Sequence, residues 1–244
     1  KGKCSKKIQS WNQRKQVQCI LGSYFVFVFW LILQELLASG SHAISKTIDQ
    51  AMSEVLSSPR VIEKLRNELN TMVGWGRHVE FSHIPHLPYL RTVLRETLRL
   101  HPPSPIIFPH MSLDSCQAMG GYVIPQGTTV FVNVWAIAHD PEVWSDDPKK
   151  FLPERLVKDS YSSVDLKGQH FELLPFSSGR RMCLGINIAL PILEITLANL
   201  LHAFDDWKLG LPSGQSSLDM SDECGIVCRR VQPLIAVPRK KNIV

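Results

Sequence analysis

The sequence predicts a helix-rich α+β fold that is mainly α with small β-elements. Apolar residues recur every three to four positions in residues 48–56, 62–73 and 90–98, and proline or glycine stands at the ends of these stretches. Short β-branched runs flank a Pro-Gln-Gly turn within residues 121–134, which predicts two strands. With 44% apolar and 20% charged residues in 244 positions, the chain has a globular composition and is long enough for a core of its own.

Proline and glycine fix the ends of two of these helices. Ser58 followed by Pro59 is typical of an N-cap and a first helical residue, and Gly74 should end the helix that they open. Pro88 opens the next helix, and His101 with the two prolines after it stops that helix.

The C-terminal part should alternate irregular and regular segments. Residues 139–182 are rich in Pro, Asp, Ser and Gly, and an irregular stretch of that length is usually functional. Residues 184–201 carry Glu194 as their only charge, so we expect a buried helix. Pro191 inside it costs about 3 kcal/mol unless the helix kinks. Residues 231–237 predict a small β-element.

The N-terminal segment 1–36 differs from the rest. The net charge of +5 comes from six basic residues within positions 1–34, which leave 21 basic against 22 acidic residues elsewhere, so we expect no nucleic-acid partner. Fifteen uncharged residues at 19–33 would span about 22 Å as a helix, less than the roughly 30 Å of a bilayer core. A short membrane anchor, a signal-peptide core and a buried segment all fit this run.

Free thiols in a reducing compartment are the expected state of the cysteines. Cys224 and Cys228 have three residues between them, whereas a zinc knuckle has two, and no second pair answers them. The chain is too long for a disulfide-stapled miniprotein. The six cysteines are Cys4, Cys19, Cys116, Cys183, Cys224 and Cys228.

The strongest candidate site is a loop at residues 176–185 that contains one cysteine. Glycines stand on both sides of Cys183, and an apolar helix begins directly after it. A thiolate at a helix N-terminus is favoured by the helix dipole and by free backbone N–H groups. A lone buried cysteine is more often an inert small hydrophobe, so the loop alone leaves both interpretations open.

Five positions of this loop resemble the haem-binding loop of the cytochromes P450, position for position. The resemblance implies that Cys183 is the catalytic axial thiolate and metal ligand of haem iron, which pushes electron density onto the iron. It also implies that Phe176 shields the sulfur, that Gly179 permits the tight turn, and that Arg181 pairs with a haem propionate through its planar fork. Gly185 completes this set of cofactor-binding positions.

Glu96 and Arg99 form a second signal. Periodicity alone places this i, i+3 pair opposite the apolar face of its helix, as a solvated surface pair. The resemblance implies instead a buried structural ion-pair triad, completed by Arg155 from a Pro-Glu-Arg segment. The order and spacing of Glu96, Arg99, Arg155 and Cys183 match the family.

The segment after that helix also resembles the family. His110 is the candidate for a further propionate contact, with an exposed loop histidine as the alternative. Residues 104–107 would line the substrate side of the haem. Residues 133–141 and 225–228 are similar to the plant, largely biosynthetic, branch of the family.

The resemblance runs from about residue 37 to 238 and implies the C-terminal half of the cytochrome P450 fold. It divides the chain into an atypical basic and apolar segment at 1–36 and a partial haem domain at 37–244. Family members are about twice as long, so we expect a truncated or mispredicted gene product in which residues 24–33 are not native coding sequence.

Residues 40–44 depart from the family pattern. Members usually carry an acid and a threonine there, which deliver protons for oxygen activation. His42 stands in the place of the acid and Ala43 in that of the threonine. Because Ala43 has no proton to give, delivery would need water or substrate. His42 could relay protons, or could ligate the iron and block it.

The resemblance implies a haem-thiolate oxidoreductase, a monooxygenase that inserts one atom of dioxygen into a small apolar specialised-metabolite substrate. Electrons would come from NADPH through a reductase docked beside the Cys183 loop. The protein would sit on the endoplasmic reticulum membrane, facing the cytosol. Two alternatives stay open: a truncated, non-catalytic remnant that holds haem weakly, and a non-oxygenase haem enzyme, which Ala43 would allow.

Overall fold

The chain divides into two compact units, Lys1–His42 and Ala43–Val244. The computed structural model describes residues 2–118, 120–145, 147–158, 161–211, 217–225 and 227–240, with the side chains of 2–23, 205 and 240 left out. Cys4 and Cys19 therefore lie outside the described side chains. Each unit is described by itself.

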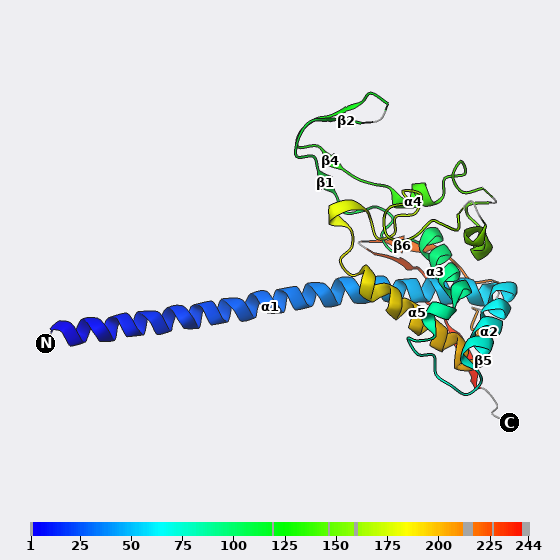
Figure 1. The fold of residues 1–244 in the computed structure, drawn as a ribbon, viewed down its shortest axis with the longest axis horizontal. Coiled ribbons are helices and arrows are strands. Elements are labelled where there is room, and N and C mark those ends of the chain that lie inside the picture. Colours follow the sequence, from blue (N-terminus) through cyan, green and yellow to red (C-terminus); the bar gives the residue numbers. More distant parts are fainter. Residues whose placement is uncertain are drawn as a thin grey trace. The chain divides into compact units, whose positions relative to one another are not determined.

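The unit Lys1–His42 contains the first part of helix α1, Gly2–Ser57 (Figure 1). Its large apolar side chains from Tyr24 to Leu37 are exposed. Among the described residues, the helical stretch Tyr24–Ser57 is long and apolar enough to cross a membrane, judged by length and composition. The length of residues 19–33 alone therefore does not argue against a membrane anchor, because the helix continues well beyond residue 33.

The unit Ala43–Val244 begins with the end of α1 and is rich in helices. Pro59 and Pro88 open α2 and α3, and Gly74 caps α2, as the sequence predicts. The further elements are α2 (Pro59–Val73), η1 (Ile84–His86), α3 (Pro88–Leu100), α4 (Val134–Ala138), η2 (Pro153–Val157), η3 (Gly179–Arg181) and α5 (Ile186–His202).

The strands are short and pair in four antiparallel ladders, β1 with β4, β2 with β3, β5 with β8 and β6 with β7. The two strands beside the Pro-Gln-Gly turn exist, but each pairs with an earlier strand, which builds the projecting arm of Figure 1. The strands are β1 (His110–Met111), β2 (Cys116–Gln117), β3 (Val123–Ile124), β4 (Thr129–Val130), β5 (Phe204–Leu209), β6 (Asp222–Cys224), β7 (Cys228–Arg230) and β8 (Ala236–Lys240).

Helix α3 joins two apolar clusters. Its residues Leu90, Val93 and Leu94 belong to the larger cluster, with side chains from α2, α5 and the end of α1. Leu98, one turn further on, belongs to the smaller cluster. The buried residues of that smaller cluster are Leu98, Trp144, Leu156, Val164, Leu166, Leu173 and Ile186. Helix α3 is therefore held in place by both clusters.

Helix α5 is only partly buried, which corrects the expectation of a helix buried nearly all round. Leu193 and Leu197 face the core, but Ile188 is 67% exposed, and Leu184, just before the helix, is 98% exposed. Only one face of α5 packs against α2 and α3. Pro191 stands in the second turn, where the helix continues through it at the loss of a single backbone hydrogen bond.

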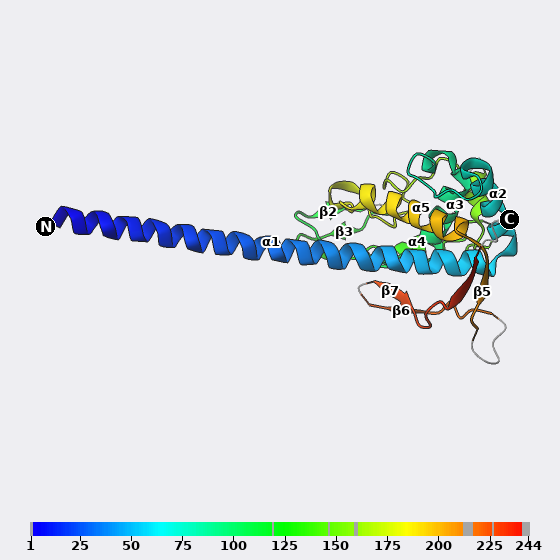
Figure 2. The ribbon, with the colours of Figure 1, turned by 90° about the horizontal axis from the view of Figure 1, so that it is seen from below.

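The β6–β7 hairpin lies on the other side of the last turns of α1 from α3 and α5 (Figure 2). Its register pairs Cys224 with Cys228, and a disulfide joins them. The expectation of free thiols is therefore wrong for these two cysteines, because spacing along the chain does not reveal a cross-strand register. Cys116 and Cys183 are free and exposed.

Glu68 of α2 positions the start of α3. Its carboxylate accepts hydrogen bonds from the backbone N–H groups of Tyr89 (2.7 Å) and Leu90 (2.9 Å). The first N–H groups of a helix have no partner inside it, and the helix dipole favours a negative charge there. Burial raises the pKa of Glu68, and these two hydrogen bonds oppose the rise. The carboxylate thus acts as an N-terminal cap supplied by another helix.

We expect Glu68→Ala to lower the free energy of unfolding by about 1–2 kcal/mol, because two buried donors of α3 lose their acceptor. Urea unfolding followed by circular dichroism measures the change. Glu63→Ala is the matched control, since Glu63 is an exposed residue of the same helix; it should change stability by less than about 0.5 kcal/mol. Equal effects of the two substitutions would contradict the capping role.

Candidate functional site

The loop before α5 holds Cys183 at the surface, while two of its side chains, Phe176 and Met182, pack against the core. The Cys183 N–H donates to the Phe176 carbonyl (2.9 Å), and the Met182 N–H donates to the Gly179 carbonyl (3.2 Å). Phe176 and Met182 pack against the smaller apolar cluster. The loop is therefore closed by its own backbone and fixed to the core, with the thiol on the outside.

Two residues of the loop, Ser177 and Gly179, have left-handed backbone. Gly179 has φ +70°, a conformation that costs glycine little. Ser177 has φ +65°, which is costly for a residue with a Cβ. The next residue, Ser178, is extended, and its hydroxyl donates to the Gly168 carbonyl at 2.5 Å. The turn that presents Cys183 is thus tight and partly strained.

The surroundings of Cys183 suit one thiolate ligand of a large apolar cofactor. Among the residues that the structure describes, no three His, Cys, Asp or Glu side chains gather as ligands for a bare metal ion. Iron in haem needs one protein ligand on this side, since the macrocycle supplies four others. Exposed Leu184 and Ile188 offer apolar surface, and exposed Arg181 offers a cation for a carboxylate. The residues present fit haem.

Helix α5 adds an electrostatic contribution. Gly185 is its N-cap, and Cys183 lies two residues before it. The positive end of a helix favours an anionic sulfur. A Cβ built on Gly185 would lie 3.7 Å from the Cys183 sulfur, so Gly185 keeps the space beside the thiol open. Phe176, Gly179, Arg181, Cys183 and Gly185 are thus all in this one loop.

His110 does not contact this loop directly. It lies in β1, opposite Val130 of β4, and its side chain is exposed. Within the described part of the chain it makes no hydrogen bond or ion pair with Arg181 or Cys183. Its role as a propionate contact stays a prediction.

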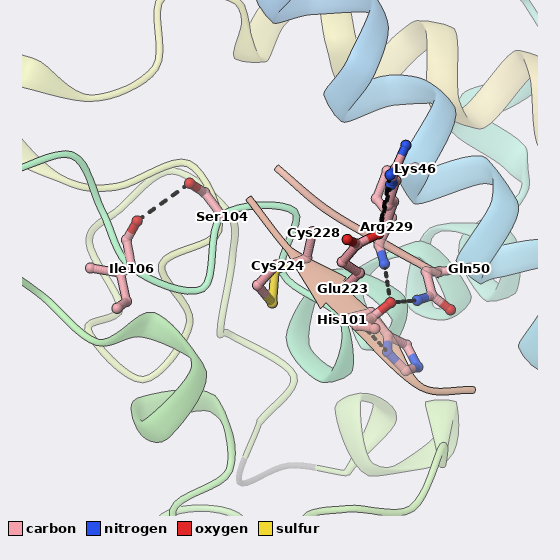
Figure 3. Close-up of a disulfide and its surroundings, with 10 residues drawn as sticks. Lys46, Gln50, His101, Ser104, Ile106, Glu223, Cys224, Cys228 and Arg229 are labelled. Atoms are coloured by element: carbon pink, nitrogen blue, oxygen red, sulfur yellow. Dashed lines mark hydrogen bonds and ion pairs between the residues drawn. A yellow bond between two sulfur atoms is a disulfide. The ribbon is translucent and has the colours of Figure 1, made fainter. Parts of the chain in front are cut away.

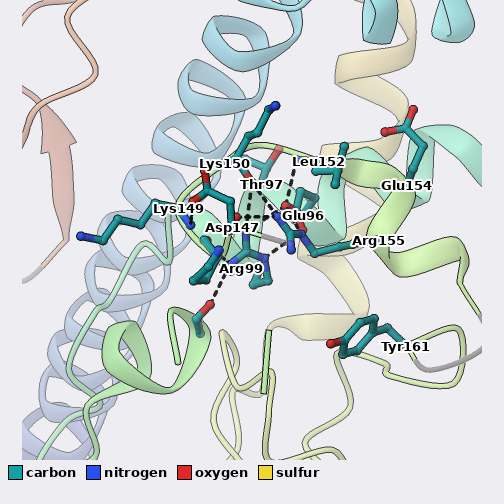
Figure 4. A network of polar contacts seen from close by, with 12 residues as sticks. Glu96, Thr97, Arg99, Asp147, Lys149, Lys150, Leu152, Glu154, Arg155 and Tyr161 are labelled. Atoms are coloured by element: carbon teal, nitrogen blue, oxygen red, sulfur yellow. Dashed lines mark hydrogen bonds and ion pairs between the residues drawn. The ribbon is translucent and has the colours of Figure 1, made fainter. Parts of the chain in front are cut away.

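Glu96, Arg99 and Arg155 meet inside the protein, and each is fully buried (Figure 4). The Glu96 carboxylate accepts hydrogen bonds from Nε and Nη2 of Arg99 and from Nε of Arg155, all at 2.9 Å. The Leu152 N–H adds a fourth at 3.0 Å. The helical-wheel interpretation of a surface pair is wrong, because a long loop covers this face of α3.

The two arginines also bind that loop through its backbone. Arg99 Nη1 donates to the carbonyls of Ala138 (2.7 Å) and Pro148 (2.8 Å). Arg155 donates to the carbonyls of Ser145 (2.7 Å), Asp147 (2.9 Å) and Lys150 (2.9 Å). Buried charges are tolerated when pairing and hydrogen bonds replace their hydration.

This network is connected to the cysteine loop through the core. Leu98, beside Arg99, and Leu156, beside Arg155, belong to the same apolar cluster that Phe176 and Met182 pack against. Arg99 also lies over the buried Trp144 ring, 5.3 Å from its centroid. The ion-pair network therefore fixes the surface on which the loop of Cys183 rests.

A polar cluster around Asp222 of β6 was not predicted from the sequence; Figure 3 labels its members Lys46, Gln50 and His101. Lys46 of α1 forms an ion pair with the Asp222 carboxylate, and Gln50 donates to it at 2.7 Å. Burial lowers the pKa of Lys46, and the hydrogen bond to Asp222 opposes the fall. His101, at the end of α3, lies 2.7 Å from Glu54 through Nε2. The polar residues at positions 46, 50, 53 and 54, which alternate with apolar residues at helical spacing, were the available signal.

His42 and Ala43 lie in helix α1. His42 is exposed, and its Nδ1 lies 2.8 Å from the Ala38 carbonyl. In the neighbouring unit the Ala43 carbonyl accepts a hydrogen bond from the Thr47 hydroxyl (2.9 Å). Ala43 brings no side-chain donor, and the hydroxyl of Thr47 is already engaged with the backbone.

The chain is similar to known proteins over most of its length. The family model described as Cytochrome P450 matches residues 31–232. A protein named iridoid oxidase from Catharanthus roseus is 43% identical over 211 residues, 86% of this chain and 40% of that protein. A flavonoid 3'-monooxygenase from Arabidopsis thaliana is 39% identical over 211 residues, with the same shares covered. The chain spans about 40% of the length of these relatives.

The fold is also similar to solved structures. A zebra fish cytochrome P450 solved with abiraterone matches with a TM-score of 0.71 and 32% identity. The match covers 84% of this chain and 46% of that one. The family match at residues 31–232 includes the helices and the loop that hold the candidate site.

We expect Ser177→Gly to stabilise the chain by about 1 kcal/mol, because glycine adopts φ +65° at little cost. Ser178→Gly, at the adjacent extended position, should destabilise the chain, since it loses the hydroxyl bond to Gly168 and gains backbone freedom. Thermal unfolding of both variants gives the comparison. Shifts of the same sign would rule out the left-handed strain at Ser177.

We expect Glu96→Gln to lower the free energy of unfolding by about 3–5 kcal/mol, because two buried guanidinium groups lose their anion. Glu223→Gln is the control: its partner Arg229 is exposed, and such pairs contribute about 0–1 kcal/mol. Denaturant midpoints of the two variants measure the difference. A loss for Glu96→Gln no larger than the control's would mean that the buried triad does not stabilise the fold.

Proposed function

Because this chain belongs to the cytochrome P450 family, we propose that it forms the haem-binding part of a haem-thiolate monooxygenase. The observation that carries the proposal is the free, exposed thiol of Cys183, presented by a loop fixed to the core and backed by the positive end of α5. The buried network of Glu96, Arg99 and Arg155 supports that loop.

Each of the loop residues would have its own role in binding haem. Cys183 would be the axial thiolate and metal ligand, and Gly179 and Gly185 would keep the turn tight and the space beside the sulfur open. Phe176 would shield the sulfur from water, which its packing on the core supports. Arg181 would pair with a propionate, and His110 of β1 is proposed as a second propionate contact.

Haem held by a thiolate supplies the activation of dioxygen, with one oxygen atom going into the substrate. We assign the substrate to small apolar specialised metabolites, which the printed names of the iridoid and flavonoid relatives support. Electrons would come from NADPH through a reductase. Exposed Arg180 of this loop supports docking of an acidic partner surface.

The location proposed for the protein is the endoplasmic reticulum membrane, with this part facing the cytosol. The exposed apolar side chains of residues 24–37 support membrane association, because a helix apolar on all sides is poorly suited to water. The basic residues that precede them, with no acid before Glu35, fit the cytoplasmic side of a membrane.

A second candidate function is non-oxygenase haem chemistry, such as isomerisation or dehydration. The observation that favours it is Ala43, which brings no side-chain proton donor to its turn of α1, while the Thr47 hydroxyl is bound to the backbone. Reactions that need no delivery of protons to oxygen would tolerate this arrangement.

A carbon monoxide difference spectrum of the reduced, haem-reconstituted chain tests the proposal. We expect the Soret band typical of thiolate-ligated haem, and its complete loss in Cys183→Ser. Cys116→Ser is the matched control, because Cys116 is also a free, exposed thiol, and it should leave the band unchanged. A band that persists in Cys183→Ser would refute the ligand. Absence of any band in the unaltered chain would favour a non-catalytic remnant.

A further inference from the structure

The β6–β7 hairpin carries two cysteines that no part of the proposed haem chemistry uses (Figure 3). We propose that Cys224 and Cys228 form a redox modification site, which glutathione disulfide closes to a disulfide and glutathione reopens to two thiols. The change would act on the tip of the hairpin, next to the segment that follows α3.

The hairpin itself brings the two sulfurs together. Cys224 and Cys228 are opposite one another in the antiparallel register, with Cα atoms 4.1 Å apart, and a disulfide joins them. Their accessibility differs: Cys224 is exposed, whereas Cys228 is 3% exposed. The Cys224 thiol can therefore react with a reagent from solvent, while the buried Cys228 thiol lies beside it.

The base of the hairpin is held without the disulfide. Asp222 is bound by Lys46 and Gln50 of α1. On the other strand Arg230 donates to the Ser53 hydroxyl and, at 2.9 Å, to the Asp219 carbonyl. These contacts are at the first residue of β6 and the last of β7. Opening the disulfide would thus release the tip and leave the base in place.

One contact links the tip to its surroundings. The Cys228 N–H donates to the Pro103 carbonyl at 2.9 Å, so the second strand stays attached to the segment after α3. At the end of β6, Cys224 is held to this anchored strand by the disulfide. The redox state would therefore decide how firmly Cys224 is held to Cys228.

A bond between residues four positions apart is poorly suited to a purely structural role. Cross-links that close short loops restrict the unfolded chain least, so they add little to global stability. Disulfides that face the cytosol are usually transient, catalytic or redox-sensing. This last step rests on the proposed location, whereas the geometry of the pair stands without it.

The exchange balances in two steps. The Cys224 thiolate attacks one sulfur of glutathione disulfide, which forms a mixed disulfide and releases one glutathione thiolate. The Cys228 thiolate then attacks the Cys224 sulfur, which forms the Cys224–Cys228 bond and releases the second glutathione. Two protein thiols are oxidised, one glutathione disulfide is reduced to two thiols, and the two protons pass to the released thiolates or to buffer.

Equilibration of the whole chain in glutathione buffers of increasing disulfide fraction, followed by alkylation and tryptic mass spectrometry, tests the site. Residues 209–229 form one tryptic peptide that contains both cysteines and no other. We expect this peptide to lose two hydrogens in a single reversible transition, while Cys116 stays open to alkylation. The internal bond should form about tenfold more readily in the folded chain than in urea, because the register holds the thiols together.

Two variants separate this order of events from unspecific oxidation. Cys228→Ser should stop at the first step, with one glutathione retained on Cys224. Cys224→Ser should leave the buried Cys228 unmodified. A pair that stays reduced at the highest disulfide fraction, equal glutathionylation of the two variants, or equal pairing in folded and urea-unfolded chain would overturn the proposal. None of these readouts depends on haem, so the outcome is independent of the carbon monoxide spectrum.

Backbone amide exchange of the oxidised and reduced chain tests the proposed effect. The disulfide should slow exchange in residues 223–228 at least fivefold and leave Asp222 and Arg230 unchanged. No difference at the tip, or an equal change throughout the unit Ala43–Val244, would refute a local switch.

Discussion

The burial of one carboxylate between two guanidinium groups is the constraint on which the larger unit depends. Glu96 lies on α3, which joins the two apolar clusters, and its partners Arg99 and Arg155 bind the backbone of a loop that has little regular structure of its own. Three buried charges would be unfavourable separately; together they replace their hydration with hydrogen bonds to one another and to the backbone of the covering loop, which they order. The loop of Cys183 rests on the surface that results.

Local signals in the sequence were sufficient for the helix ends and for the extent of the cysteine loop, whereas the role proposed for Cys183 comes from the resemblance. Pro59, Gly74 and Pro88 act through their own backbone geometry, so their positions predict where α2 and α3 begin and where α2 ends. The set of residues at 176–185 is likewise contained in one loop. Features of this kind need no knowledge of what packs against them.

Local patterns missed the features that depend on distant partners, and only the resemblance predicted the buried triad of Glu96, Arg99 and Arg155. Periodicity placed Glu96 and Arg99 at the surface, because it records the apolar face of a helix and not the loop that covers the other face. Lys46 and Asp222 are 176 positions apart, and the pairing of Cys224 with Cys228 follows from a hairpin register. Helix α5 is apolar nearly all round, yet only one face has a partner in this chain, so composition overstated its burial.

The contacts that Arg99 and Arg155 make with the covering loop have a consequence for which changes the chain can accept. They go to the carbonyl oxygens of residues 138–150, which every amino acid possesses, so these hydrogen bonds do not depend on the side chains of that loop. Its length is not free. One added or deleted residue would move a carbonyl out of reach of a guanidinium that is fixed in the core. Asp147, whose carbonyl is one of these acceptors, already has left-handed backbone (φ +58°). The two arginines thus constrain the number of residues in the loop, and their hydrogen bonds do not depend on which residues it contains.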